Sequence, residues 1–243
     1  LLYVELDSFV YFDASKVSNV NALKTRIIEG LTTYSKSTDV NKFGGRFKYS
    51  KALNIIDDID TAITSNITRV KIRRNLRAVL NSFAQYELCF GNQFRINQEG
   101  KNIKSTGFTI EGENEIVYIT DIPNKDNNGN LDGSGLGVIS IVREDSLRNT
   151  VVVVKSAGTV DYIHGEIILT TVNITSTVKE NNVIEIQAFP DSNDVVGLKD
   201  LYLDFSISNT TINMVKDTIT SGEQISGVGF KVTSSYSNGE LTR

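Results

Sequence analysis

The segment that decides the predicted fold is Lys42–Arg74, KFGGRFKYSKALNIIDDIDTAITSNITRVKIRR. Gly44-Gly45 interrupts the periodicity of the preceding residues, and Ser50 is of a type that caps helix N-termini. Beyond Ser50, apolar side chains recur at spacings of three and four, which predicts an amphipathic helix. These side chains are Leu53, Ile56, Ile59 and Ile63. After Asn66 the apolar residues alternate instead, so we expect a strand to follow.

This predicted strand carries positive charge on one face. Its apolar residues Val70 and Ile72 point one way, and the cations between and beside them point the other way. Like charges on one face repel unless carboxylates or anions neutralise them. The partner could be intramolecular, such as the acids at the end of the helix, or the charge could keep an edge strand soluble. The alternative is a docking face for an acidic protein; nucleic acid is less favoured because no aromatic platform is interleaved with the cations.

The acidic end of the helix and the basic strand together form our candidate protein interface. A metal site at the clustered acids is conceivable, but a solvated helix face explains them better. We hypothesise that the acids of one copy match the cations of a second copy in a symmetric dimer. Strand edges elsewhere, or the loop Asn124–Gly137, could carry the interface instead. The eight residues of the candidate interface are Asp57, Asp58, Asp60, Arg69, Lys71, Arg73, Arg74 and Arg77.

The rest of the chain predicts one more helix and many short strands. Residues 2–6 and 9–12 alternate loosely, like a strand or the edge of a hairpin, and Ser18 can cap a helix whose apolar stripe ends at Tyr34. Between Tyr86 and Phe189 about eight apolar runs alternate with Gly- and Asn-containing turns, which favours a β-sandwich or a strongly twisted antiparallel sheet. The tail adds a strand around residues 201–207 and another at Gly227–Thr233.

These elements predict an α+β fold. We expect a small helix-plus-strand domain over residues 1–85, packed with a larger antiparallel, β-sandwich-like domain over residues 86–190. Residues 191–243 would add C-terminal strands that complete one of the two. We further expect these late strands to return to the first domain and pair with Thr68–Arg73.

Composition excludes several classes of protein. The chain has 243 residues, 40% of them apolar, with one cysteine (Cys89), and its net charge of −4 argues against bulk nucleic-acid binding. No signal peptide and no membrane-spanning apolar run is visible. Because the chain starts at Leu1 within a strand-like run and its one methionine is Met214, we expect it to be part of a longer protein.

No catalytic constellation stands out. Asp126, Asn128, Asn130 and Asp132 of KDNNGNLDGSG alternate like calcium ligands. An EF-hand loop, however, needs glycine sixth and glutamate twelfth, where Leu131 and Gly137 stand, so we predict a hairpin connection. Gly133, Gly135 and Gly137 lead into a strand, whereas phosphate binding requires a helix N-terminus. The single histidine, His164, precedes a glycine between two strand runs and is predicted to be a turn residue.

Several blocks of the sequence resemble a known family. They are YFDASKVSNVNALKTRIIEGL (residues 11–31), NKFGGRFKYSKALNIIDDIDTAITSNITRVKIRR (41–74), GTVDYIHGEIIL (158–169), DVVGLKDLYLDFSIS (194–208), INMVKDTITSG (212–222) and VGFKVTSSY (228–236). They are similar to the ring-forming baseplate wedge proteins of T4-type tailed phages, the gene six family, which is distantly akin to J-type baseplate proteins. The likeness covers the whole chain and would make it the C-terminal portion of such a protein.

The resemblance implies a structural role without enzymatic activity or cofactor. In that family, paired copies form a ring that ties six wedges around a hub, and the C-terminal part pairs copies of neighbouring wedges through the change of baseplate shape. The expected partners are a second copy and other wedge proteins, with no nucleic acid and no membrane, in the tail baseplate of a virion assembled in the bacterial cytoplasm. A glycan-binding tail or adhesin module is the alternative, although the chain lacks the tryptophan that favours sugar stacking. A hydrolase using His164 is a third possibility, for which no substrate can be named.

Overall fold

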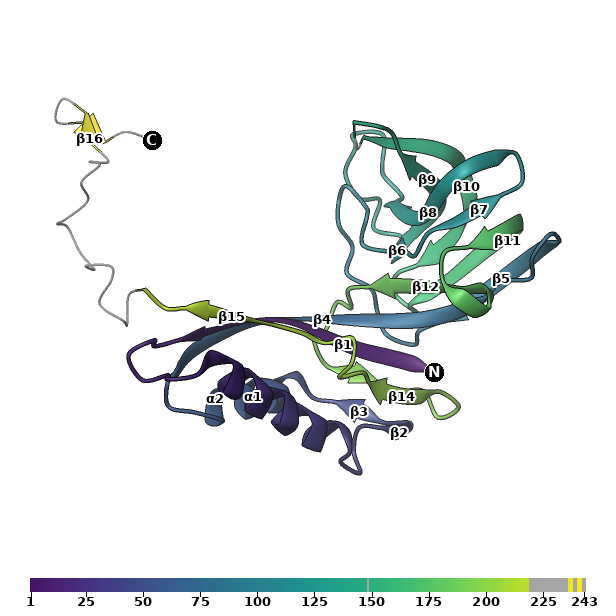
Figure 1. Ribbon diagram of the computed structural model, residues 1–243. Coiled ribbons are helices and arrows are strands. Elements are labelled where there is room, and N and C mark those ends of the chain that lie inside the picture. The colour runs from purple at the N-terminus through teal and green to yellow at the C-terminus, as the bar shows by residue number, and fades with distance from the viewer. Residues whose placement is uncertain (148, 219–235, 238–239, 242–243) are drawn as a thin grey trace.

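The computed structural model describes residues 1–147, 149–218, 236–237 and 240–241, and it is mostly β-structure (Figure 1). Strands make up 50% of the described residues and helices 13%, with two α-helices and a closed β-barrel. The predicted α+β class is therefore wrong. No helix among the described residues is both long and apolar enough to cross a bilayer.

The elements, in chain order, are β1 Leu2–Phe12, α1 Val20–Ser35, β2 Lys42–Phe43, β3 Arg46–Phe47, α2 Tyr49–Asp58, β4 Ile63–Arg77, β5 Phe83–Cys89, β6 Lys104–Ser105, β7 Phe108–Ile110, β8 Glu113–Pro123, β9 Leu136–Glu144, β10 Thr150–Asp161, β11 Glu166–Thr177, the 3₁₀ turn η1 Glu180–Asn182, β12 Val183–Ala188, β13 Val195–Val196, β14 Tyr202–Phe205, β15 Thr211–Lys216, β16 Tyr236–Ser237 and β17 Glu240–Leu241.

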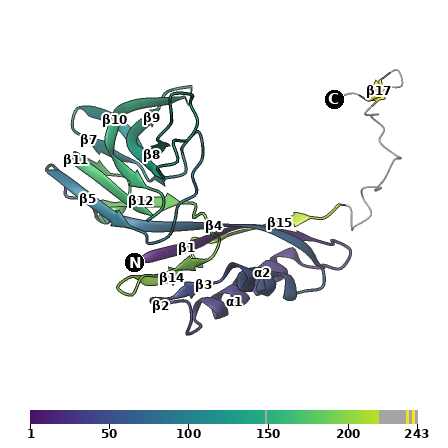
Figure 2. The ribbon, with the colours of Figure 1, turned by 180° about the vertical axis from the view of Figure 1, so that it is seen from behind.

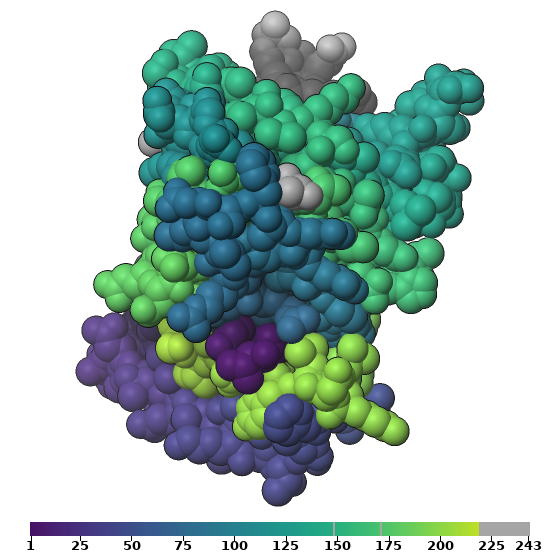
Figure 3. Space-filling view, turned by 90° about the vertical axis from the view of Figure 1, so that its right-hand side faces the viewer, coloured from purple at the N-terminus to yellow at the C-terminus, as the bar shows by residue number. Residues whose placement is uncertain are grey.

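Strand β1 is central to the sheet at the N-terminal end of the fold. It pairs antiparallel with β4 on one edge, and on the other edge it pairs in parallel with β14 and then with β15. The late strands thus return to the N-terminal region, but they pair with β1 and not with residues 68–73. The strand predicted at Gly227–Thr233 lies outside the described residues. In Figure 3 the first residues of β1 (purple) reach the surface between the blue and light-green parts of the chain.

Both helices cover the same face of this sheet, as the two opposite views in Figures 1 and 2 show. Alternate residues of β1 point into the layer between sheet and helices, and each is at most 5% exposed; they are Leu2, Val4, Leu6, Ser8, Val10 and Phe12. Aromatic rings close one end of this layer, where Phe47 and Phe205 meet edge to face with their ring centroids 5.1 Å apart. The period-2 pattern of β1 therefore serves a single buried face.

The helix boundaries differ from the predicted ones by a residue or more. The N-cap of α1 is Asn19 and not Ser18, and its side chain accepts a hydrogen bond from the N–H of Ala22 at 3.1 Å. Helix α2 starts at Tyr49, before the predicted cap Ser50, and it ends at Asp58. Ile63, which fits the helical stripe in the sequence, is the first residue of β4.

Strand β4 is long enough to join the two halves of the molecule. Its first part pairs with β1, whereas its C-terminal part pairs with β12. The other edge of β12 pairs with β6, and β6 pairs with β8 of the barrel. The sheet therefore runs without a break from β1 into the barrel, which stands on the side of β4 opposite the helices (Figure 1).

The middle of the chain closes on itself and does not form two stacked sheets. The pairings β8–β9, β9–β10, β10–β11, β11–β7 and β7–β8 return to the strand where they began. Register shifts in β10 and β11 supply the bends that closure needs. At Gly158 a Cβ atom would lie 2.1 Å from the carbonyl oxygen of Ile168, so this close strand crossing requires glycine. The β-sandwich expectation is corrected accordingly.

Two local predictions in this region are confirmed. Residues 124–135 connect β8 to β9, whose facing ends pair Pro123 with Gly137. His164 lies in the turn between β10 and β11. The division at residues 85 and 190 stays a prediction.

Candidate interaction surface

The face of the N-terminal sheet that points away from the helices carries the charges of β4. In the β1–β4 ladder, Glu5 lies opposite Lys71 and Asp7 lies opposite Arg69. Each cation thus faces a carboxylate of the neighbouring strand, the arrangement that stabilises antiparallel pairs. The cationic strand therefore has intramolecular partners, although they come from β1 and not from the acids of α2.

Arg73 is the most enclosed of these cations, with 6% of the residue exposed. Its Nε donates to Glu5 Oε1 at 2.5 Å, and its Nη1 donates to Glu185 Oε1 at 3.2 Å. The guanidinium carbon also lies 4.1 Å from the centre of the Tyr3 ring, a cation–π distance. Arg73 is therefore a buried, fully engaged charge that binds β1 and β12 to β4.

Arg74 points to the other side of β4 and is also engaged. One of its guanidinium nitrogens donates to the backbone carbonyl of Cys89, at the end of β5. Burial lowers the pKa of the Arg74 guanidinium from its usual value, and the negative groups near it act the other way. This contact links β4 to β5, which otherwise pairs with β11.

The remaining cations of the candidate interface are accessible. Arg69 and Arg77 are exposed, and Lys71 is half-buried with its Nζ 3.9 Å from Asp7 Oδ2. The structure therefore separates the five predicted cations into two that bind other parts of the fold and three that face solvent.

The acids of the candidate interface lie at the far end of α2 and do not contact these cations. Asp57 accepts a hydrogen bond from Asn66 Nδ2 at 2.7 Å, and Asp60 forms an ion pair with Arg26 at 2.8 Å. The hydrogen bond from the N–H of Ala62, followed by the contact with Arg26, lowers the pKa of Asp60. Asp58 is exposed. Within the described ranges no group of three or more metal-ligating side chains is gathered.

The open side of the sheet also carries apolar residues, which lie outside the candidate interface predicted from the sequence. Phe9 is 40% exposed and Ile67 is 55% exposed, and they lie directly opposite each other in the β1–β4 ladder. Val215 of β15 is half-buried beside Tyr11 in the next row. The signal was present in the sequence, because Ile67 has the same parity along the strand as Arg69 and so belongs to the cationic face.

Strand β15 forms an edge of this sheet. Among the described residues it pairs with β1 alone, over Asp7–Phe12, and no described strand pairs with its outer edge along Thr211–Val215. An unpaired edge offers backbone N–H and C=O groups to another chain. We call Phe9, Ile67 and Arg69, together with β15, the open sheet surface.

Residues 1–75 match the family described as baseplate structural protein gp6, C-terminal domain III. This range includes β1, both helices and most of β4, and so contains Phe9, Ile67 and Arg69 of the open sheet surface. A comparison with curated proteins found no match. The family match supports a structural role in a phage baseplate, located in the virion tail and associated with other baseplate proteins.

Proposed function

We propose that this chain is the part of a baseplate wedge subunit that pairs copies in neighbouring wedges and so holds the baseplate ring together through its change of shape. The family match supports the baseplate setting. The observation that carries the pairing is the open edge of β15, which lies beside the apolar pair Phe9 and Ile67.

A second copy fits this edge because an antiparallel pairing of β15 with itself is self-complementary. A two-fold axis at Asn213 places Ile212 opposite Met214 of the other copy, and Thr211 opposite Val215. Ile212 and Met214 then stay on the helix-covered side of the joined sheet. Each strand gains hydrogen bonds along Thr211–Val215, whose outer edge pairs with no strand among the described residues.

In this proposal the charged residues of the candidate interface add contacts but do not determine the pairing. The exposed members of the candidate interface, Asp57, Asp58, Arg69 and Arg77, are available to a second copy or to another wedge protein. Arg73 and Arg74 are not, because both already bind other parts of the same chain. The exposed face around Phe9 and Ile67 would receive a neighbouring wedge protein, since edge pairing extends the sheet without covering its face.

The self-pairing is tested by introducing a charge at the axis. Asn213→Lys and Asn213→Glu each place two like charges opposite each other, so each variant alone should be monomeric in sedimentation equilibrium at concentrations where the unmodified chain dimerises. An equimolar mixture of the two should dimerise, because Lys then faces Glu. Pairing at this edge would be contradicted if both single variants still formed dimers as the unmodified chain does. It would also be contradicted if the mixture of the two variants stayed monomeric.

The glycan-binding alternative gains no support from the exposed aromatic residues. That alternative requires several rings to line one groove. Among the described residues, the most exposed phenylalanines are Phe9, Phe43 and Phe83, and they lie on three different strands, β1, β2 and β5.

A further inference from the structure

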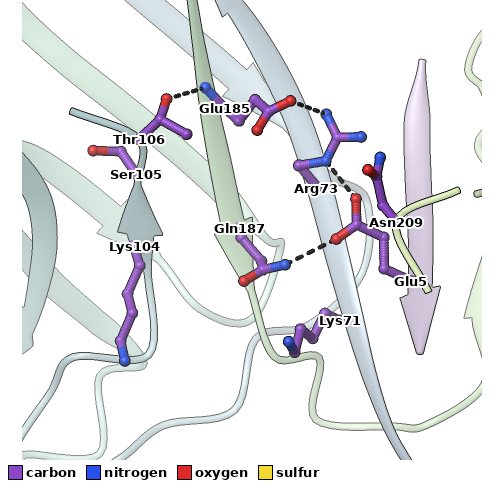
Figure 4. A pocket seen from close by; sticks show the side chains of 9 residues that line it. All are labelled: Glu5, Lys71, Arg73, Lys104, Ser105, Thr106, Glu185, Gln187 and Asn209. Carbon is purple, nitrogen blue, oxygen red and sulfur yellow. Dashed lines mark hydrogen bonds and ion pairs between the residues drawn. The ribbon is translucent and has the colours of Figure 1, made fainter. Parts of the chain in front are cut away.

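A polar pocket of about 320 Å³ lies where the N-terminal sheet meets the barrel. Strands β1, β4, β6 and β12 provide most of its wall, and Figure 4 shows the side chains around it. Its lining residues are Glu5, Lys71, Arg73, Lys104, Ser105, Thr106, Glu185, Gln187 and Asn209. The pocket therefore contains three cations and two carboxylates.

Both carboxylates of the pocket are already satisfied at every oxygen. Glu5 accepts from Arg73 at Oε1 and from Gln187 Nε2 at Oε2, at 2.5 and 2.9 Å. Glu185 accepts from Arg73 at Oε1, and its Oε2 lies 3.3 Å from the ammonium of Lys179. Arg73 is equally occupied, so these groups form a closed network and offer little to an incoming ligand.

Two lysines of the pocket are not neutralised in this way. Lys71 lies 3.9 Å from Asp7, at the outer limit of an ion pair, and among the described residues no carboxylate lies within 4 Å of the ammonium of Lys104. Figure 4 shows both ammonium groups extending toward the same end of the pocket. When Asp7 and Lys179 are included with the lining residues, the site has one positive charge in excess.

Two hydroxyl groups add hydrogen-bond donors to the same wall. Ser105 Oγ accepts the N–H of Ile119 at 2.8 Å, and Thr106 Oγ1 accepts the N–H of Glu185 at 2.9 Å. Because each oxygen serves as an acceptor to the protein, its own hydrogen remains available to another acceptor. The free groups of the pocket thus include two cations and two hydroxyl donors, beside the amide oxygens of Gln187 and Asn209.

We propose that this pocket binds one side-chain carboxylate of an acidic segment on a neighbouring baseplate protein, held between Lys71 and Lys104. A single excess charge matches a monovalent carboxylate, whereas the fixed Glu5 and Glu185 disfavour a phosphate dianion or a nucleic-acid backbone. The inference rests on the proposed baseplate role for the source of the segment, but it does not depend on self-pairing at β15. Bound there, the segment would connect the N-terminal sheet and the barrel to the same partner.

The test is an NMR titration of the chain with an acetylated, amidated Gly-Glu-Gly peptide and, in parallel, with Gly-Gln-Gly and inorganic phosphate. The Glu peptide should give saturable shifts at residues 104–106 and 187 that Gly-Gln-Gly does not produce. The double variant Lys71→Gln/Lys104→Gln should bind it about tenfold more weakly. Lys155→Gln, which changes an exposed lysine of β10, is the matched control and should bind as the unmodified chain does.

Three results would overturn the inference. They are equal binding of the Glu and Gln peptides, a loss of affinity in Lys155→Gln as large as that in the double variant, and tighter binding of phosphate than of the Glu peptide. The titration is also run on Asn213→Lys, the variant designed to be monomeric. Binding of the Glu peptide by this variant would show that the pocket works whether or not the chain pairs through β15.

Discussion

Arg73 donates hydrogen bonds to carboxylates on two neighbouring strands, Glu5 of β1 and Glu185 of β12. A charge with 6% exposure is stable only because its partners meet it with good geometry. If the arginine is removed, two carboxylates remain at a largely buried site without their cation. Removing the cation therefore lowers the free energy of unfolding by more than the intact ion pair contributes to it.

We therefore predict that Arg73→Met destabilises the fold by about 3–5 kcal/mol in urea denaturation, because two carboxylates lose their buried partner. The exposed Arg77→Met on the same strand should change stability by less than about 0.5 kcal/mol. If the two variants had equal midpoints, the network around Arg73 would contribute nothing specific. For the same reason, charge reversal at Arg73 reports on folding and not on an interface.

The contact between His164 and Asp161 can be tested through the pKa of a single residue. Its Nδ1 lies 2.7 Å from Asp161 Oδ2, and this contact raises the pKa of the imidazole above its usual range. As the chain has one histidine, an NMR titration reads its pKa without assignment. Asp161→Asn should return that pKa toward the value of a free histidine. A pKa unchanged by the substitution would mean that the ion pair does not form in solution.

At the scale of elements, α2 shows how a distant residue completes a local structure. Lys48 occupies its N-cap and makes no side-chain capping bond, and Ser50 lies inside the helix. Asp194 fills the role, since its Oδ1 accepts the N–H of Tyr49 at 2.8 Å. The carboxylate also lies at the positive end of the helix dipole.

Asp194→Ala should therefore destabilise the protein by roughly 1 kcal/mol, the usual cost of a lost cap. Asp194→Asn retains an accepting oxygen and should recover most of that loss, and Ser50→Ala should have little effect. The three free energies of unfolding can be compared in one denaturant series. A larger effect of Ser50→Ala than of Asp194→Ala would contradict the assignment of the cap.

At the scale of the whole molecule, a buried carboxyl ties the interior of the barrel together. Asp121 of β8 is fully buried, accepts the Tyr162 hydroxyl at 2.7 Å through Oδ2, and accepts the N–H of Ile103 at 2.6 Å through Oδ1. Burial raises the pKa of Asp121 above its usual value, and these hydrogen bonds oppose the shift. The folded state therefore holds a proton on this carboxyl at pH values where the unfolded chain releases it.

The sign of the pH dependence follows by linkage. A carboxyl whose pKa is raised on folding contributes a stability that falls as pH rises from its unfolded pKa, about 3.9, to its raised folded pKa. Asp121→Asn cannot titrate, so the free energy of unfolding of the unmodified chain, minus that of the variant, should fall across this window and level off above it. A difference that instead rises with pH below about 3.9 and stays flat above it would show that the hydrogen bonds outweigh burial.

Local chemistry determined much of this molecule from its sequence. Alternation predicted strand structure along β1 and β4, a three-and-four spacing predicted both helices, and a Gly-containing segment predicted the turn at His164. These patterns are readable because each depends on which side of one element faces apolar surroundings. The resemblance to phage wedge proteins, carried by residue strings, agrees with the family match over residues 1–75.

Only the tertiary structure decided how these elements combine. The closed barrel, the return of β14 and β15 to β1, the cap from Asp194 and the partners of Arg73 all join residues far apart in the chain. Such pairings depend on register, bulges and strand crossings, and a periodic pattern is the same whether its strand enters a sandwich or a barrel. A run of alternating cations likewise looks the same whether its charges face a partner protein or carboxylates of its own neighbouring strands.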